Sequence, residues 1–185
     1  MGTSSALRIE GYAVVSADGM IADAHGVLPP SLIREEDQRF YLSALDRVDV
    51  VVHGRHSAEN PRAPARRRLV VTKLVRALTA DAALGNAILW NPAGVSFEDA
   101  LAAFKTPLRS AGVLGGTDVF TLFLDRFDVF SLTRIDGVRL PGGRPVFRGV
   151  PEQTPEEILG AHGLRRQRDV LRASGLTIAA WSRIS

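Results

Sequence analysis

Short runs of β-branched and aliphatic residues alternate along the chain with longer amphipathic stretches, and this alternation restricts the fold more than any other feature. Turn residues flank most of the apolar runs, as they flank buried strands. The predicted strands are residues 12–15, 49–52, 69–72, 87–90, 112–115 and 129–135, and the predicted helices are residues 34–45, 96–104 and 117–124. Because the strands are continuously apolar and helices separate them, we expect a three-layer α/β/α fold around a mostly parallel central sheet.

The last quarter of the chain departs from this alternation. Residues 140–147, LPGGRPVF, are rich in turn formers, and residues 151–164 have the composition of a short connector. Residues 175–184, GLTIAAWSRI, are expected to form a final strand that runs antiparallel to its neighbour. Since no repeat and no flexible linker divides the sequence, residues 1–185 are expected to form a single domain.

Composition excludes several classes of protein. Hydrophobic residues make up 45% of the chain and charged residues 23%, which is typical of a soluble globular domain. The sequence contains no cysteine, so it has neither a disulfide scaffold nor a thiolate metal site. No apolar run approaches the ~18 residues that span a bilayer, and the segment MGTSSALRIE lacks the apolar core of a signal peptide. We therefore expect a cytoplasmic protein without membrane contact.

The basic residues favour a small anionic ligand. There are 23 lysines and arginines against 20 acids, for a net charge of +3, and all but Lys73 and Lys105 are arginines. Acids lie among the arginines, and the one dense run is residues 62–68, so nucleic acid binding is disfavoured as the main role. His53 and His56 lie three positions apart without a third ligand nearby, so no metal site is expected.

Two strand ends carry residues that suit phosphate groups. After the strand that ends at Leu114, Gly115 and Gly116 lead into a helix that begins near Thr117. Glycines let the backbone pass close to a ligand, and the free N–H groups and dipole of a helix N-terminus favour an anion. This pair of glycines is equally compatible with a plain strand-to-helix turn.

The second strand end is the segment HGRHS, in which Gly54 is followed by Arg55, His56 and Ser57. Ser57 is placed to cap a short helix that Pro61 would end after about one turn. Two such ends at the carboxyl edge of one sheet indicate a dinucleotide with several phosphates, although the G-x-G-x-x-G fingerprint is absent.

A third segment, VVSADGMIAD at residues 14–23, leaves the first strand through a polar turn. It is either a simple hairpin-like turn or a loop that lines a pocket and presents Ser16 and Asp18 to a substrate. The residues themselves leave both interpretations open.

Taken in this order and spacing, the three segments resemble those of the dihydrofolate reductase-like superfamily. GRHSAEN is similar to its cofactor-binding glycine, basic pair and hydroxyl, and VLGGTDVFTLFLDRFDVFSLTRID resembles its Gly-Gly cofactor loop with the following helix and strand. SADGMIA is similar to the Ser-x-Asp-Gly-x-Ile-Ala stretch of riboflavin-biosynthesis pyrimidine reductases, and GGRPVF resembles their Gly-Gly-x-Pro-x-Phe segment. The resemblance extends from Leu7 to Ile184.

The resemblance implies NADPH as the hydride donor and a homodimer as the assembly. By position, the residues implied to face the phosphates are Gly54, Arg55, His56 and Ser57, and those implied to hold the pyrophosphate are Gly115, Gly116, Thr117, Asp118 and Val119. Thr72 and Lys73 match the place where the superfamily grips the adenosine 2′-phosphate, and Arg76 is a weaker candidate. A cation there favours NADPH over NADH.

The same resemblance bears on the substrate. Dihydrofolate reductases place a carboxylate on the first helix to hold the pterin ring, and Glu36 or Asp37 falls in that region. Glu36 is the better match by its spacing from Gly54, although acids are favoured at any helix N-terminus. Arg66 matches the arginine that grips the folate tail, or is one of three solvated arginines.

Two departures favour the pyrimidine reductase branch, which reduces a ribosyl-aminopyrimidine side chain to its ribityl form. GVLPPSL stands in place of the Trp-Pro-x-Leu segment of dihydrofolate reductases, and LPGGRPVF replaces their Gly-Asp-Thr segment. We expect a reductase of the 5-amino-6-(5-phosphoribosylamino)uracil type without a zinc deaminase half. The expected catalytic residues are Asp18, Glu36 and Asp37, and the expected substrate contacts are Ser16 and Arg66. The alternatives are a dihydrofolate reductase, a non-catalytic nucleotide-binding relative and an arginine-rich nucleic acid binder.

Overall fold

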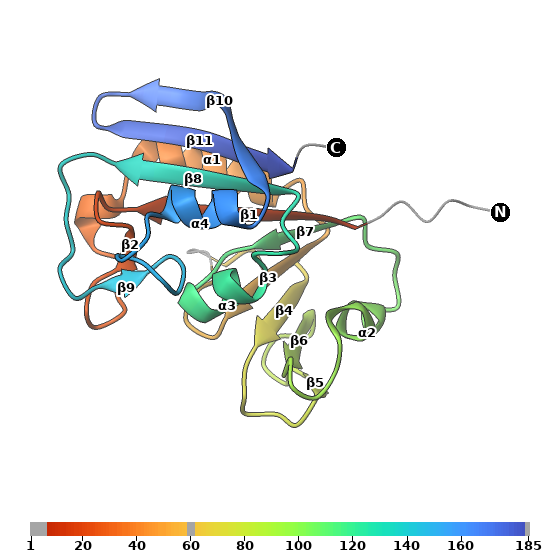
Figure 1. Cartoon of the computed structure of the whole chain (residues 1–185). Coiled ribbons are helices and arrows are strands. Elements are labelled where there is room, and N and C mark those ends of the chain that lie inside the picture. The colour runs from red at the N-terminus through yellow and green to blue at the C-terminus, as the bar shows by residue number, and fades with distance from the viewer. Residues whose placement is uncertain (1–6, 59–61, 184–185) are drawn as a thin grey trace.

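A nine-stranded sheet runs through the computed structural model, which describes residues 7–58 and 62–183 (Figure 1). The strand order is β10-β11-β8-β1-β7-β3-β4-β6-β5. Its strands are β1 (Arg8–Val15), β3 (Val50–Gly54), β4 (Arg68–Val71), β5 (Leu78–Ala80), β6 (Ala87–Trp90), β7 (Ser110–Val113), β8 (Val129–Ile135), β10 (Leu164–Ala173) and β11 (Leu176–Arg183). From β8 through β6 every neighbouring pair is parallel, whereas β10, β11 and β5 run antiparallel to their neighbours.

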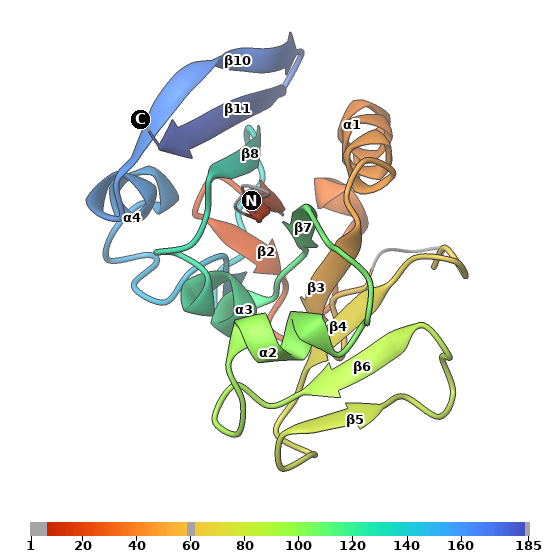
Figure 2. The same cartoon turned by 90° about the vertical axis from the view of Figure 1, so that its right-hand side faces the viewer.

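Helices cover both faces of this sheet, so the chain forms three layers (Figure 2). The helices are α1 (Glu35–Leu45), α2 (Phe97–Ala102), α3 (Thr117–Leu122) and α4 (Pro155–Ala161), and a 3-10 turn spans Pro30–Leu32. Figure 2 shows α1 alone on one side of the sheet, with α3 and α4 on the other. None of the helices in the described part of the chain has the length and apolar character that a membrane span needs.

Alternation along the central strands directs side chains into the two layers. In β3, Val50 and Val52 belong to the core cluster that also contains residues of α2, α3 and α4, whereas Val51 belongs to a separate cluster with Leu45 of α1. All three valines are fully buried, as expected for a central parallel strand covered on both sides. The sequence therefore predicted the covered parallel sheet correctly.

Phenylalanines fill the layer between the sheet and α3. The rings of Phe127 and Phe130 lie 5.0 Å apart and those of Phe120 and Phe130 lie 5.4 Å apart, both near-perpendicular. Each buried phenylalanine contributes roughly 1.5–3 kcal/mol of hydrophobic stabilisation, so this cluster fixes α3 firmly against β8.

The structure confirms the predicted central strands and the first three helices within one or two residues, except that β1 begins four residues earlier than predicted, and β11 is antiparallel as expected. The prediction of a connector at residues 151–164 is wrong, because helix α4 forms there. Thr154 and Glu157 make a capping box, in which each side chain accepts a hydrogen bond from the backbone N–H of the other residue. Pro155 occupies the first turn of the helix.

The short helix expected after Ser57 falls mainly on residues 59–61, which the structure does not describe, so it stays a prediction. Arg55 and His56 make a turn, which the hydrogen bond from Ser57 N–H to the Gly54 carbonyl closes at 3.1 Å. Residues 59–61, which include Pro61, lie outside the described part of the chain.

Candidate functional site

A cavity of about 460 Å³ opens between α1 and the sheet, near the carboxyl ends of β1, β3 and β7. Tyr12 and Val14 of β1 line its floor beside Ser131 and Thr133, their partners on β8. The short strand β2 (Met20–Ala22) and the loop after it form one wall. β2 pairs with β9 (Arg144–Pro145) in a separate two-stranded sheet.

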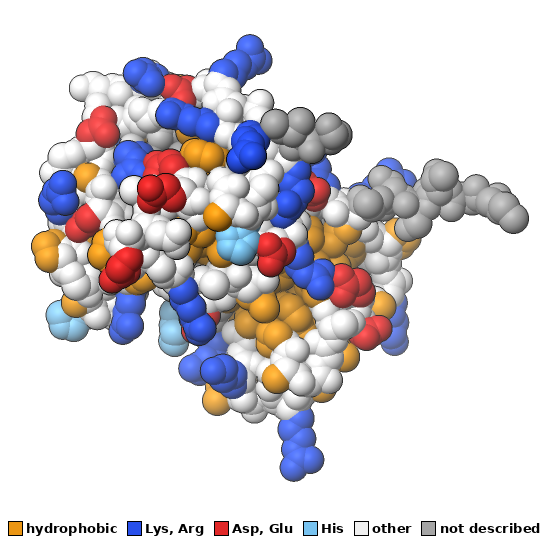
Figure 3. Space-filling view, in the orientation of Figure 1, with side chains coloured by type: hydrophobic (Ala, Val, Ile, Leu, Met, Phe, Trp, Pro, Cys, Tyr) orange, Lys and Arg blue, Asp and Glu red, His pale blue; other side chains and the backbone are white. Residues whose placement is uncertain are grey.

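A second hollow of the same volume lies between α2 and the start of β1. Its lining is mainly apolar, and Figure 3 shows apolar side chains gathered between α2 and α3 in that view. Arg126 and Glu98, its charged residues, pair with each other at 2.5 Å. The first cavity is the better candidate because it combines a buried carboxyl group, several hydroxyl groups and backbone turns built on glycine.

Asp37 is the one acidic residue that lines the first cavity among the described residues. It lies in the first turn of α1 and only 6% of it is exposed. The hydroxyl of Thr133 donates a hydrogen bond to Asp37 Oδ1 at 2.5 Å. Burial raises the pKa of Asp37, and the hydrogen bond from Thr133 offsets only part of that effect. A carboxyl group in this setting retains its proton more readily than an exposed one.

Glu36, the acid that sequence spacing favoured, is half-buried and does not line the cavity. The helical turn directs neighbouring residues to different sides, so only one of the two acids can face the sheet. The sequence does contain a signal for Asp37. Ser131 and Thr133 place two hydroxyl groups on one face of the mainly apolar strand β8. Sequence reasoning missed both of these residues.

The two glycine turns lie side by side at one end of the cavity. Gly54 donates from its N–H to the carbonyl of Gly115 at 2.8 Å, which joins the ends of β3 and β7. Gly115 has a φ of +94°, and a Cβ there would lie 2.4 Å from the Phe120 ring, so this position needs glycine. The Gly115–Gly116 peptide is cis.

Gly116 leaves open space at the cavity wall. A Cβ built there would lie 3.4 Å from Ser57 Oγ and 3.9 Å from Ile21 Cδ1. Gly116, Ser57 and Ile21 all line the cavity. No side chain in the described part of the chain caps the N-terminus of α3, where Gly116 is the N-cap residue. The structure thus brings Gly54, Ser57 and Gly116 together, as the sequence predicted.

The side chains at the start of α3 have other partners. Thr117 donates from its hydroxyl to the carbonyl of Pro145. Asp118 accepts from Arg148 at 2.7 Å on the surface, and the side chain of Val119 is buried. What these three residues can offer an anion is therefore their backbone N–H groups.

Cations lie along the same edge of the sheet. Lys73 follows β4, next to β3 in the sheet, and its exposed side chain forms no ion pair with any described residue. Thr72 is buried, and its hydroxyl accepts from Leu74 N–H at 3.1 Å. Arg55 and His56 are exposed, as is Arg76. This edge can therefore attract an anionic ligand.

Ser16 and Asp18 do not line the cavity, and their expected roles in substrate binding and catalysis stay predictions. Ser16 donates to Asp18 Oδ1 at 2.5 Å and accepts from Met20 N–H at 3.0 Å. Asp18 also accepts from Leu140 N–H at 3.1 Å. Partial burial acts to raise the pKa of Asp18, but the hydrogen bonds from Ser16 and Leu140 outweigh this effect and lower the pKa. A carboxylate used in this way organises a turn.

Arg66 is also placed away from the cavity. It donates to Asp46 Oδ1 at 2.6 Å, where Asp46 is the C-cap residue of α1. Since Arg66 precedes β4, this contact lies at the amino edge of the sheet, opposite the glycine turns. Residues 7–58 and 62–183 hold no group of three or more His, Asp or Glu side chains arranged to bind a metal ion.

No protein-family model matches the sequence, and no curated protein matches it. Solved structures do match its fold. A Shewanella sp. PV-4 protein assigned to riboflavin biosynthesis superposes with a TM-score of 0.66 at 18% identity, over 97% of this chain and 100% of that one. The diaminohydroxyphosphoribosylaminopyrimidine deaminase/5-amino-6-(5-phosphoribosylamino)uracil reductase of Thermotoga maritima gives 0.66 at 19% identity, over 96% of this chain and 57% of that one.

Dihydrofolate reductase from Enterococcus faecalis, complexed with NADP(H) and RAB-propyl, also superposes with a TM-score of 0.66. The identity is 17%, and the match covers 96% of this chain and 97% of that one. The chain therefore has the dihydrofolate reductase-like fold.

Proposed function

We propose that this protein is an NADPH-dependent reductase that transfers a hydride to a heterocycle-linked substrate bound in the cavity beneath α1. The observation that carries the proposal is the buried carboxyl group of Asp37, held by Thr133 in a cavity that ends at the two glycine turns. The reductases among the solved structures with this fold support the same reaction class.

The cavity end formed by the glycine turns fits a dinucleotide. The space beside Gly116 is one that a Cβ would occupy, and the N–H groups at the start of α3 have no side-chain cap among the described residues. Gly54, Ser57 and Gly116 would hold the phosphates, and Lys73 would bind a 2′-phosphate. NADPH, when bound there, supplies a hydride.

Asp37 would bind the ring of the substrate and supply a proton to it. Its raised pKa keeps a fraction of the carboxyl group protonated where an exposed aspartate would be ionised. The hydroxyl of Thr133 fixes Oδ1, which leaves the other carboxyl oxygen for a ring nitrogen. Apolar neighbours such as Phe40 and Leu114 limit the access of water to this group.

The first candidate substrate is 5-amino-6-(5-phosphoribosylamino)uracil. Besides the similarity of SADGMIA and GGRPVF, one observation supports it: Arg144 Nε lies 3.9 Å from the position of a Cβ on Gly26. Gly26 lines the cavity, and Arg144 is exposed and forms no ion pair with a described residue. A guanidinium group at the mouth suits a phosphate ester.

Dihydrofolate is a second candidate, and two observations favour it. Asp37 occupies the helix on which dihydrofolate reductases carry the carboxylate that the resemblance implies. At the mouth of the cavity, Val27, Leu28 and Ile33 are exposed by 59%, 40% and 47%, and such an apolar rim suits an aryl substituent.

The test is to measure NADPH binding and then NADPH oxidation with each substrate offered separately. If NADPH is oxidised with the phosphoribosylamino substrate and Arg144→Met slows this oxidation, the first candidate is supported. If NADPH is oxidised with dihydrofolate and Arg144→Met leaves the rate unchanged, the second candidate is supported. NADPH that binds but is oxidised with neither substrate would support a non-catalytic nucleotide-binding relative. Failure to bind NADPH would overturn the proposal.

A further inference from the structure

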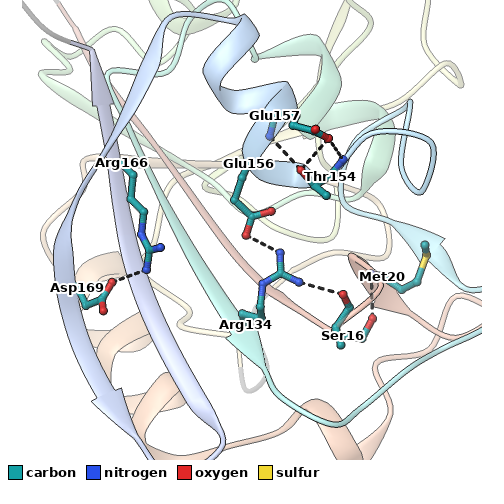
Figure 4. Close-up of polar contacts among 9 residues, drawn as sticks. Ser16, Met20, Arg134, Thr154, Glu156, Glu157, Arg166 and Asp169 are labelled. Carbon is teal, nitrogen blue, oxygen red and sulfur yellow. Dashed lines mark hydrogen bonds and ion pairs between the residues drawn. The ribbon is translucent and has the colours of Figure 1, made fainter.

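We propose that Arg134 is a positioning residue that fastens one wall of the cavity to β8 and α4. Arg134 donates from one guanidinium nitrogen to the carbonyl of Ala17 at 3.0 Å and from the other to Glu156 Oε1 at 2.5 Å (Figure 4). Ala17 belongs to the turn between β1 and β2, and Glu156 to the first turn of α4. One side chain thus joins three elements that are distant in sequence.

The turn that Arg134 holds is fitted closely to the later part of the chain. Val146 donates from its N–H to the carbonyl of Gly19 at 3.0 Å, and Ala17 donates to the carbonyl of Val138 at 2.7 Å. A Cβ on Gly19 would lie 2.8 Å from Val150 Cγ1, and its φ is +82°. The turn therefore has little freedom to move while these contacts remain.

This turn continues directly into the cavity wall. Ile21 and Ala22 of β2 line the cavity, as do Val27 and Leu28 in the loop that follows. Ile21 Cδ1 lies beside the open space at Gly116, where the dinucleotide would enter under the proposed function. A displacement of the turn would therefore change the distance between this wall and the glycine turns.

Thr133 and Arg134 are consecutive on β8, so their side chains point to opposite faces of the sheet. Thr133 fixes the carboxyl group of Asp37 on the α1 face, and Arg134 fixes the turn on the α4 face. Strand β8 thus sets the position of the acid relative to the wall, which is the geometric requirement of the proposed reaction. To this extent the inference rests on the proposed function.

The contact is suited to positioning more than to stability. The side chains of Arg134 and Glu156 are 27% and 34% exposed, and ion pairs that reach solvent contribute only about 0–1 kcal/mol. Variants at Arg134 should therefore fold. The bond to the Ala17 carbonyl, by contrast, is a charge-assisted contact with a specific direction.

The experiment is hydrogen exchange on the free protein with Arg134→Gln, Arg134→Lys and a matched control, Arg166→Gln. Arg166 pairs with Asp169 at 2.6 Å on the β10–β11 hairpin and has no contact with the turn, as Figure 4 shows. We expect faster exchange of amides 17–22 in Arg134→Gln, partial recovery in Arg134→Lys, and exchange as in the unmodified protein for Arg166→Gln. Amides of β3 and β4 should exchange at the same rate in all proteins.

The kinetic arm measures KM and kcat separately with the substrate that the protein turns over. Arg134→Gln should raise KM by about fivefold with a smaller change in kcat, because the wall is displaced and Asp37 is not. Unchanged exchange at 17–22 in Arg134→Gln would overturn the inference, even if the enzyme is active. Faster exchange in a protein that oxidises no substrate would leave the positioning role standing and count against the proposed function alone.

Discussion

The hydroxyl of Thr133 lies 2.5 Å from Asp37 Oδ1 and joins strand β8 to helix α1 inside the cavity. The contact spans the gap between a strand and a helix that are separated by about half of the chain. If Asp37 supplies the proton in catalysis, Asp37→Asn should lower kcat/KM by about 10²- to 10³-fold. Steady-state kinetics with the accepted substrate will measure this, and Glu36→Gln is the matched control because Glu36 does not line the cavity. Equal losses in both variants would contradict the assignment.

The pH dependence of activity follows from the direction of the Asp37 pKa. Burial raises this pKa above its ordinary value of 3.8, so the protonated form extends to higher pH than for an exposed aspartate. We expect kcat/KM to fall as the pH rises through the raised pKa, and this limb of the profile to disappear in Asp37→Asn. A profile that is the same in both proteins would show that another group supplies the proton.

The same raised pKa predicts how stability changes with pH. Folding favours the protonated form of Asp37, so its stabilising contribution is fully present below pH 3.8 and is lost as the pH rises through the folded-state value. The difference in the free energy of unfolding, unmodified protein minus Asp37→Asn, should therefore decrease between acidic and neutral pH. Urea denaturation of both proteins at a series of pH values will measure it. A difference that does not vary with pH would contradict the raised pKa.

Gly116→Ala tests the dinucleotide site. The φ of Gly116 is −72°, which other residues adopt, and the added Cβ would lie 3.4 Å from Ser57 Oγ, so the fold should tolerate the change. We expect NADPH affinity to fall by about tenfold or more while the free energy of unfolding changes by less than about 1 kcal/mol. Gly160→Ala is the control, since a Cβ there meets nothing within 4 Å. Unaltered NADPH binding in Gly116→Ala would remove this turn from the site.

Lys73→Gln tests the choice between NADPH and NADH. Lys73 is exposed at the end of β4 and pairs with no described acid, so its charge is available to a 2′-phosphate. The variant should lose about fivefold to tenfold in NADPH affinity and retain its NADH affinity, as measured by titration of the two cofactors. Lys105, the only other lysine, lies after α2 and before β7, and Lys105→Gln should alter neither affinity.

The capping box of α4 gives a prediction about stability alone. Thr154 Oγ1 accepts from Glu157 N–H at 3.2 Å, and the Glu157 carboxylate accepts from Thr154 N–H at 2.7 Å. Thr154→Ala should lower the free energy of unfolding by about 1 kcal/mol, as loss of a helix N-cap usually does. Urea denaturation will measure the change, and a loss near zero would indicate that packing of Ile158 and Leu159 determines the helix by itself.

Sequence patterns predicted the sheet and three helices because apolar periodicity decides whether a segment can be buried. They failed for α4, where a capping box and a proline at the first turn were present but the apolar stripe is short. They failed also for β10, whose arginines and exposed faces give no strand-like alternation at the edge of the sheet.

For the site, patterns located the glycine turns, since a left-handed φ at Gly115 restricts the residue type directly. They did not separate Asp37 from Glu36, because that choice depends on how α1 is rotated against the sheet. Patterns could not decide whether Ser16 and Asp18 face a substrate, because a polar turn and a polar pocket have the same composition, and their roles stay predictions. The homodimer and the cytoplasmic location stay predictions.

The position of β1 in the sheet has a consequence for the order of assembly. Its first residues pair with β7 on one side and β8 on the other, through Arg8 with Ser110 and Glu10 with Val129. Of the described strands, β1 is thus made before all the others, yet it stays unpaired until β7 has emerged. Such long-range pairing slows folding and leaves an apolar strand open to wrong partners in the meantime. Fragments that end before β7 should therefore aggregate, however intact their own helices are.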